Sequence, residues 1–180
     1  MMKTKENAWN VPVAVDDIPE TGLHVEIEAP AEVRADIAEV AGLRELPRLS
    51  ATFELLKQGS RVTVTGQVSA TVGQTCVVTL EPIESRIEEP VDLVFAPLPA
   101  GAIAEAGDTR SRKGSEEPPE PLLDGHIDLG VIATELLILG IDPYPRKAGA
   151  HFMPPEASDE GAHPFAALEA LKKRPGSQKT

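Results

Sequence analysis

Residues with the chemistry of a metal site cluster at Asp124, His126 and Asp128. Imidazole and carboxylate groups can bind zinc and activate water, so this spacing is compatible with a small metal-dependent hydrolase. A complete ligand set would need His151 or His163 nearby. Aspartate is also typical of turns and helix N-caps, and we favour that interpretation.

Cys76 is the only cysteine, which excludes an internal disulfide and favours a reducing compartment. It alternates with Val78 and Leu80, a pattern that predicts a strand with Cys76 in the core. A catalytic thiolate would need exposure and a nearby cation. The chain also lacks the phosphate-binding, nucleophile-elbow and zinc-helix motifs. We therefore predict no enzymatic activity, no metal and no cofactor.

The chain has 180 residues and a net charge of −12. This charge disfavours non-specific binding to nucleic acid, and it fits either a protein with basic partners or one kept soluble by self-repulsion. The first ten residues lack an apolar signal core, and the run from Leu129 to Ile141 is shorter than the ~20 residues needed to span a bilayer. These features predict a cytoplasmic protein.

That apolar run must form a helix that positions its neighbours. Asp128 is a suitable N-cap, and Pro143 and Pro145 end the run. The predicted core stripe is Leu129, Ile132, Leu136 and Leu139, while Val131, Leu137 and Ile138 surround Glu135. Because the helix is apolar on almost every side, it must be covered by the core or by a partner.

Alternating apolar residues predict strands at 11–15, 23–29, 49–55, 62–72, 76–80 and 83–95, with a hairpin turn at Gln58–Arg61. Pro30 and Gly42 bound a helix with Val33, Ile37 and Val40 on its buried side. We predict an α+β fold: an antiparallel, twisted or barrel-like sheet covered by helices at 32–41 and 129–139, plus a short C-terminal helix from Pro164.

The composition predicts one domain over residues 9–173. It is flanked by a flexible N-terminus at 1–8 and a flexible basic tail at 174–180. The acidic, proline-rich stretch near 97–123 is predicted to be a disordered loop inside the domain.

Three blocks in order resemble the YceD family of bacterial proteins. They are Gly66–Thr79 continuing to Val94–Pro97, Ile127–Leu129 through Glu135–Leu139 to Pro145, and His163–Lys173. The resemblance covers most of the chain. It implies a non-enzymatic role in the accumulation or processing of large-subunit ribosomal RNA. Many relatives carry C-x-x-C where this chain has Cys76 and Thr79, and a further cysteine near His151. The loss of the second thiol argues against a zinc site here.

Partners of such a factor would be a ribosomal protein or pre-ribosomal particle, with large-subunit rRNA as a further contact. A protein-binding adaptor unrelated to ribosomes is an alternative, as is the metal-dependent hydrolase. The residues proposed for partner binding lie at the start of the apolar helix and along it, just after it, and at the end of the predicted domain: Asp128, Val131, Glu135, Ile138, Tyr144, Arg146, Lys147, Lys172 and Lys173. Tyr144 and Arg146 have a second interpretation, which is to pin the helix end to the sheet.

Overall fold

The structure of the protein is a computed structural model that describes residues 9–97, 119–122 and 124–152. The flexible ends predicted at 1–8 and 174–180, most of the predicted loop, the helix from Pro164, and Lys172 and Lys173 lie outside these residues. Within the described ranges, no helix has the length and apolarity needed to cross a membrane.

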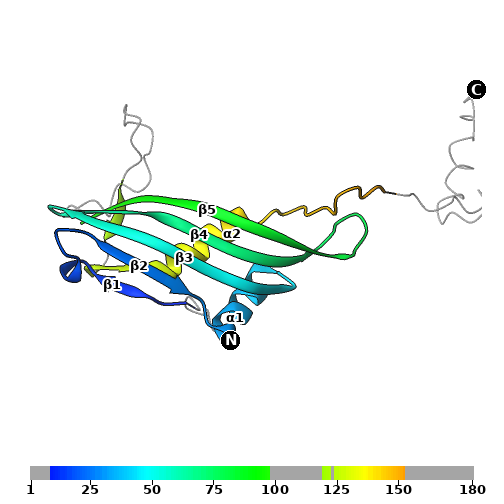
Figure 1. Ribbon diagram of the computed structural model, residues 1–180, viewed down its shortest axis with the longest axis horizontal. Coiled ribbons are helices and arrows are strands. Elements are labelled where there is room, and N and C mark those ends of the chain that lie inside the picture. Colours follow the sequence, from blue (N-terminus) through cyan, green and yellow to red (C-terminus); the bar gives the residue numbers. More distant parts are fainter. Residues whose placement is uncertain (1–8, 98–118, 123, 153–180) are drawn as a thin grey trace, which may run out of the picture.

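A five-stranded sheet dominates the molecule, in the order β2-β3-β4-β5-β6 (Figure 1). Its strands are β2 (Leu23–Glu28), β3 (Glu45–Gln58), β4 (Arg61–Thr75), β5 (Pro82–Pro97) and β6 (Glu120–Leu122). The first four form an antiparallel meander, in line with the predicted antiparallel sheet but without the strand predicted at 76–80, and Gln58 pairs with Arg61 across the predicted turn. β6 instead runs parallel to the end of β5. A second, two-stranded sheet pairs β1 (Pro12–Ala14) with β7 (His126–Asp128).

The predicted α+β class is wrong, because the described part of the chain is mostly β. Strands β3, β4 and β5 span 14, 15 and 16 residues, so strand residues far outnumber helical ones. The sheet is also not barrel-like, since β2 and β6 form its two separate edges. The core is closed by a helix and the β1–β7 pair instead of by the sheet curling onto itself.

The apolar helix, α2 (Leu129–Gly140), covers the inner face of the sheet and contacts β4 and β5 (Figure 1). The inner face carries the predicted apolar residues of the long strands, including Phe53, Val64 and Val68 at 0% exposure. On α2, however, the predicted stripe is partly wrong. Leu139 is 79% exposed, whereas Leu137 is fully buried.

Helix α1 (Ala31–Ala41) packs against β3 and lies beside the sheet, where β2 ends and β3 begins (Figure 1). Its bounds match the prediction: Pro30 precedes it, and Gly42 ends it with φ 66°, a conformation that glycine adopts without strain. Ile37 is buried as predicted, but Val40 is 66% exposed. Only the side of α1 that faces β3 is covered, so Ala38 is buried in place of Val40.

The strand predicted at Cys76, Val78 and Leu80 does not form. β4 ends at Thr75, and the chain turns before β5 begins at Pro82. The turn is closed by the Leu80 amide, which donates to the Cys76 carbonyl at 2.9 Å, and Leu80 adopts φ 60°. Leu80 is consequently 76% exposed, although Cys76 is buried as predicted.

The polar side of the four meander strands forms a surface that we call the outer face. It carries His24, Glu26 and Glu28 on β2, Arg48, Ser50, Thr52, Glu54, Leu56 and Gln58 on β3, Arg61, Thr63, Thr65, Gln67, Ser69 and Thr71 on β4, and Glu84, Arg86, Glu88, Pro90, Asp92 and Val94 on β5. Its residues alternate with the buried ones, as the predicted period of two requires.

The first prediction concerns the cap of α2. Replacing Asp128 by alanine removes the acceptor for the Gly130 and Val131 amides and for the Val11 amide. We expect the free energy of unfolding to fall by about 2 kcal/mol, because a cap is lost and an amide in the N-terminal segment loses its partner. Urea denaturation measures the loss. Glu135→Ala removes an exposed carboxylate from the same helix and should change stability by less than about 0.5 kcal/mol. Equal losses in the two variants would contradict the capping role.

Candidate functional site

Asp128 lies at the junction of three elements. Its Oδ1 accepts from the Val11 amide at 2.9 Å, the Gly130 amide at 3.0 Å and the Val131 amide at 3.2 Å. The carboxylate therefore ties β1 to the start of α2. This geometry matches the capping interpretation and directs the carboxylate into the fold.

The other two residues of the candidate metal cluster also make turn contacts, as the favoured interpretation requires. His126 Nδ1 donates to the Asp124 carbonyl at 2.8 Å, and Asp124 adopts φ 52° in the turn before β7. Among the residues that the structure describes, no group of three His, Cys, Asp or Glu side chains is arranged to hold a metal ion. The described geometry thus does not assemble Asp124, His126 and Asp128 around a common point.

The side of α2 that faces away from the sheet forms an apolar surface with one charge. We call Val131, Glu135, Ile138 and Leu139 the α2 patch. Val131 is half-buried and Glu135 is exposed, while Ile138 and Leu139 are 43% and 79% exposed. The sequence predicted the first three from their helical spacing but assigned Leu139 to the core. Exposed apolar side chains that lie together can mark a protein contact surface, so the α2 patch is a candidate for one.

The segment after α2 is fixed to the sheet by its backbone and by Lys147. Gln74 Nε2 donates to the Asp142 carbonyl at 2.9 Å, and the Val77 amide donates to the Pro145 carbonyl at 2.9 Å. Tyr144 does not pin the helix end, since its side chain is 72% exposed. Its ring is available to a partner, next to the exposed Arg146.

Cys76 lies where the turn after β4 meets this segment. Its Sγ accepts from the Lys147 amide at 3.3 Å and the Thr79 amide at 3.4 Å. These contacts, led by the Lys147 amide and followed by the Thr79 side chain, lower the pKa of the Cys76 thiol to about 6. Lys147 Nζ also donates to Glu81 Oε2 at 2.9 Å, which holds the pKa of Glu81 below its usual range and raises that of Lys147.

Cys76 therefore differs from the inert core cysteine that the sequence predicted. It is buried, but it accepts two backbone N–H groups that favour the thiolate. Because Lys147 is 71 positions away along the chain, no local pattern could have revealed this contact. The structure brings only one thiol to this place, and Thr79 contributes an amide and a hydroxyl in place of a second sulfur.

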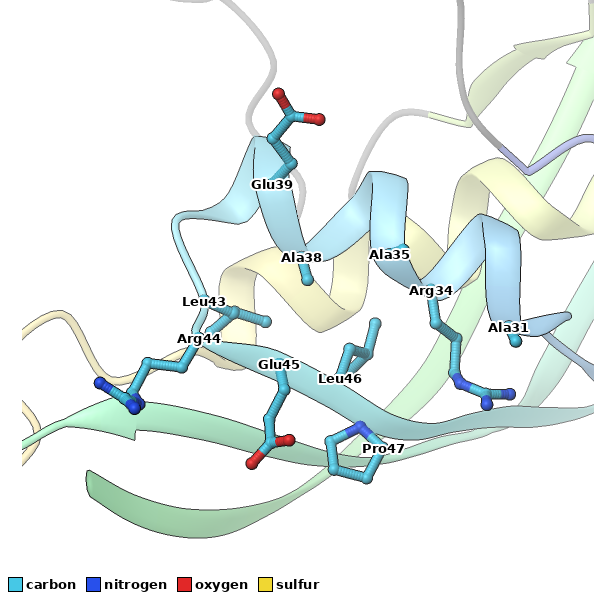
Figure 2. A pocket seen from close by; sticks show the side chains of 10 residues that line it. All are labelled: Ala31, Arg34, Ala35, Ala38, Glu39, Leu43, Arg44, Glu45, Leu46 and Pro47. Atoms are coloured by element: carbon cyan, nitrogen blue, oxygen red, sulfur yellow. The ribbon is translucent and has the colours of Figure 1, made fainter.

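A hollow of ≈ 500 Å³ lies between α1 and the start of β3 (Figure 2). Its floor is apolar, with Ala35, Ala38, Leu43 and Leu46 between the helix and the strand. The charged groups do not converge on it: Glu39 points away from the strand, and Arg44 points outward at one end (Figure 2). Arg34 Nη1 donates to the Ala29 carbonyl at 2.7 Å, which closes the end of α1 onto β2. The hollow thus has no arrangement suited to acid–base or nucleophilic chemistry.

His24 on the outer face lies between two carboxylates. Its Nδ1 is 2.5 Å from Glu54 Oε1, and its Nε2 is 3.3 Å from Glu26 Oε1. The contact with Glu54, and secondarily that with Glu26, raises the pKa of His24 because both favour the imidazolium.

Comparison with known proteins gives one match. A family model described as "Large ribosomal RNA subunit accumulation protein YceD" matches residues 64–172, which is more than half of the chain. The matched range starts within β4 and includes the Cys76 turn, β5 and α2. No curated protein and no solved structure matches the chain.

Titration of Cys76 tests its contacts. The thiolate absorbs in the ultraviolet, and because Cys76 is the only cysteine we expect one transition near the pKa of about 6 instead of 9.0. The depressed pKa means that the thiolate contributes to stability above pH 9.0 and that this contribution is lost as the pH falls through about 6. Thr79→Val removes a side-chain contact and should raise the pKa, whereas Thr71→Val on the outer face should leave it unchanged. An ordinary thiol pKa in the unaltered protein would contradict the assignment.

Titration of His24 by NMR tests its contacts with Glu54 and Glu26. We expect Glu54→Gln to lower the pKa of His24, because the leading cause of its raised pKa is removed. Glu88→Gln, on β5 of the same face, serves as the control for a general charge effect. Since the pKa is raised, the stabilisation by this contact is complete below pH 6.5 and is lost as the pH rises through the raised value. The same shift in both variants would mean that the direct contact is unimportant.

Proposed function

Because the chain belongs to the YceD family, described as large ribosomal RNA subunit accumulation proteins, we propose that it is a non-enzymatic ribosome-biogenesis factor. In this proposal it supports the accumulation or processing of large-subunit ribosomal RNA by binding a ribosomal protein or a pre-ribosomal particle. The family match carries the proposal, and the described surface is consistent with recognition.

The α2 patch is the surface best suited to that binding. Ile138 and Leu139 expose large apolar side chains beside Glu135 on a helix that is otherwise buried in the core. Burying such side chains against a partner is favourable at roughly 25 cal/mol per Å² of apolar area. A single carboxylate at the edge adds selectivity, because a partner must place a cation or water opposite it.

Direct contact with RNA is a weaker part of the proposal. Exposed Tyr144 and Arg146 provide one ring for stacking and one guanidinium for phosphate. Lys147 is already paired with Glu81, and the net charge of −12 opposes approach to a phosphate backbone. We therefore place protein binding first and RNA contact second.

The metal-dependent hydrolase has less support, because Asp128 caps α2 and the His126 ring contacts the preceding turn. An adaptor unrelated to ribosomes uses the same α2 patch. It differs from the biogenesis factor in the proteins and RNA that co-purify with it from cells. Affinity purification at low and high salt, with RNA identified after nuclease controls, separates the two functions.

Charge reversal in the α2 patch tests the proposal. In cells that carry only the Glu135→Lys variant, we expect the protein to leave the ribosomal fractions of a sucrose gradient and large-subunit rRNA to decline. An unfavourable charge at an interface weakens binding by about tenfold, or ~1.4 kcal/mol. The Glu32→Lys variant carries the same charge reversal on α1, outside the α2 patch. It should remain in the ribosomal fractions.

Two measurements keep this test specific. Circular dichroism must show that the Glu135→Lys protein is folded, since its side chain is exposed and its replacement should not unfold the helix. Unchanged sedimentation of a folded Glu135→Lys protein would exclude the α2 patch as the docking surface. Normal rRNA levels in cells lacking the protein altogether would exclude the function itself.

A further inference from the structure

The outer face of the sheet is a second surface on which the structure places no covering element. In the part of the chain that the structure describes, α2 and the β1–β7 pair both lie on the inner side, and the outer face is turned toward the viewer in Figure 1. A continuous strip of hydroxyl and amide side chains, including Thr65, Gln67 and Ser69, runs along β4. This strip offers hydrogen-bond donors and acceptors but no apolar area for a hydrophobic partner.

Carboxylates flank the strip. They are Glu26 and Glu28 on β2, Glu54 on β3, and Glu84, Glu88 and Asp92 on β5, and all are exposed. Against these six acids, the described outer face has three arginines, Arg48, Arg61 and Arg86, and the histidine His24, and it has no lysine. Soluble surfaces usually intersperse both signs of charge. The excess of carboxylates on the outer face therefore creates a negative electrostatic potential there.

The register gives the acids a defined geometry. Glu28, Ser50, Ser69 and Glu88 lie side by side on four neighbouring strands. With strands spaced about 4.8 Å apart, the two carboxylates of this row flank the strip at about 14 Å from each other. A second row has a narrower pair of acids, since Glu54 lies two strands from Asp92 across Thr65, and the row between these two carries Glu26 on β2 alone. An extended chain lying along the strip projects alternate side chains to its two sides, toward these two acidic borders.

The same charges disfavour other occupants. RNA would bring phosphates against six carboxylates and could pair with only three arginines of this face, Arg48, Arg61 and Arg86. A second copy of this face would bring like charges together. A partner that supplies many cations along an extended backbone satisfies both the charge and the spacing.

We propose that the outer face binds an extended arginine- and lysine-rich segment of a protein partner, with alternate side chains reaching the acids of β2 and β3 and those of β5. The inference rests on the proposed function for the identity of the partner, a basic protein of the large subunit. It does not depend on the α2 patch, which lies on the opposite side of the molecule.

The test uses the full chain and a labelled peptide of alternating arginine and serine. We expect fluorescence anisotropy to show binding that weakens with salt, as exposed ion pairs require. The triple variant Glu28→Lys, Glu88→Lys, Asp92→Lys should bind at least about tenfold more weakly, since three exposed pairs are lost and reversed. The matched control reverses three exposed acids outside the outer face, Glu20→Lys, Glu32→Lys and Glu120→Lys, and gives the same net charge.

The outcomes are distinct. Retained binding in the control and loss in the outer-face variant support the proposal. Equal weakening of both would show attraction to the overall charge of −12 and would overturn it. It would also be overturned if an oligouridylate of the same length bound the outer face more tightly than the peptide. If the lysine variant unfolds, the isosteric set Glu28→Gln, Glu88→Gln, Asp92→Asn replaces it and should still weaken binding relative to its Glu20, Glu32 and Glu120 counterparts.

A measurement of rRNA levels in cells separates this inference from the proposed function. Cells that carry the outer-face variant should lose large-subunit rRNA if the outer face holds the physiological partner. Normal rRNA in these cells, together with a loss in cells lacking the protein, would overturn the outer-face inference and leave the proposed function intact. Normal rRNA in both would remove the proposed function, whereas the peptide measurement would stand by itself.

Discussion

The fold depends on seating one very apolar helix against the inner face of the sheet. Leu129, Ile132 and Leu137 are buried there, and each such side chain contributes about 1.5–3 kcal/mol of transfer free energy. Asp128 caps the N-terminal end of this helix, and its carboxylate also accepts a hydrogen bond from the Val11 amide. This packing requires glycine at position 130, where a Cβ would lie 2.5 Å from the Trp9 carbonyl oxygen. Without this close approach, the N-terminal segment could not pack across the start of α2.

Because α2 packs on the inner face of the sheet, the molecule has two exposed surfaces of different character. The helix and the β1–β7 pair cover the inner face, so strands β2 to β5 must present the other side to water. α2 in turn is covered by the sheet on one side, and Ile138 and Leu139 remain on the other. An apolar surface and an acidic surface thus arise on opposite sides from one packing arrangement.

Sequence patterns predicted the parts of the fold that depend on local periodicity. Alternation located β2, β3 and β4, and the cap and proline signals located both helices. Alternation failed at Cys76, Val78 and Leu80, because a tight turn can also place one apolar residue inside and the next outside. It also failed at Leu139, since a helix that is apolar on every side does not indicate which side faces the core. The open edges, the parallel β6 and the Lys147–Cys76 contact depend on pairing between distant segments, which a single sequence does not encode locally.

The two surfaces would contribute differently to one binding event. Attraction between an acidic surface and a basic segment mainly accelerates encounter, and it weakens within a Debye length of about 8 Å at physiological salt. Burial of Ile138 and Leu139 is insensitive to moderate salt and acts chiefly on the dissociation rate. A partner that contacts only the outer face would therefore exchange rapidly, while one that reaches the α2 patch would remain bound. Because the two surfaces lie on opposite sides of the sheet, a single partner needs a long flexible segment to use both, and a particle with several proteins can use them at once.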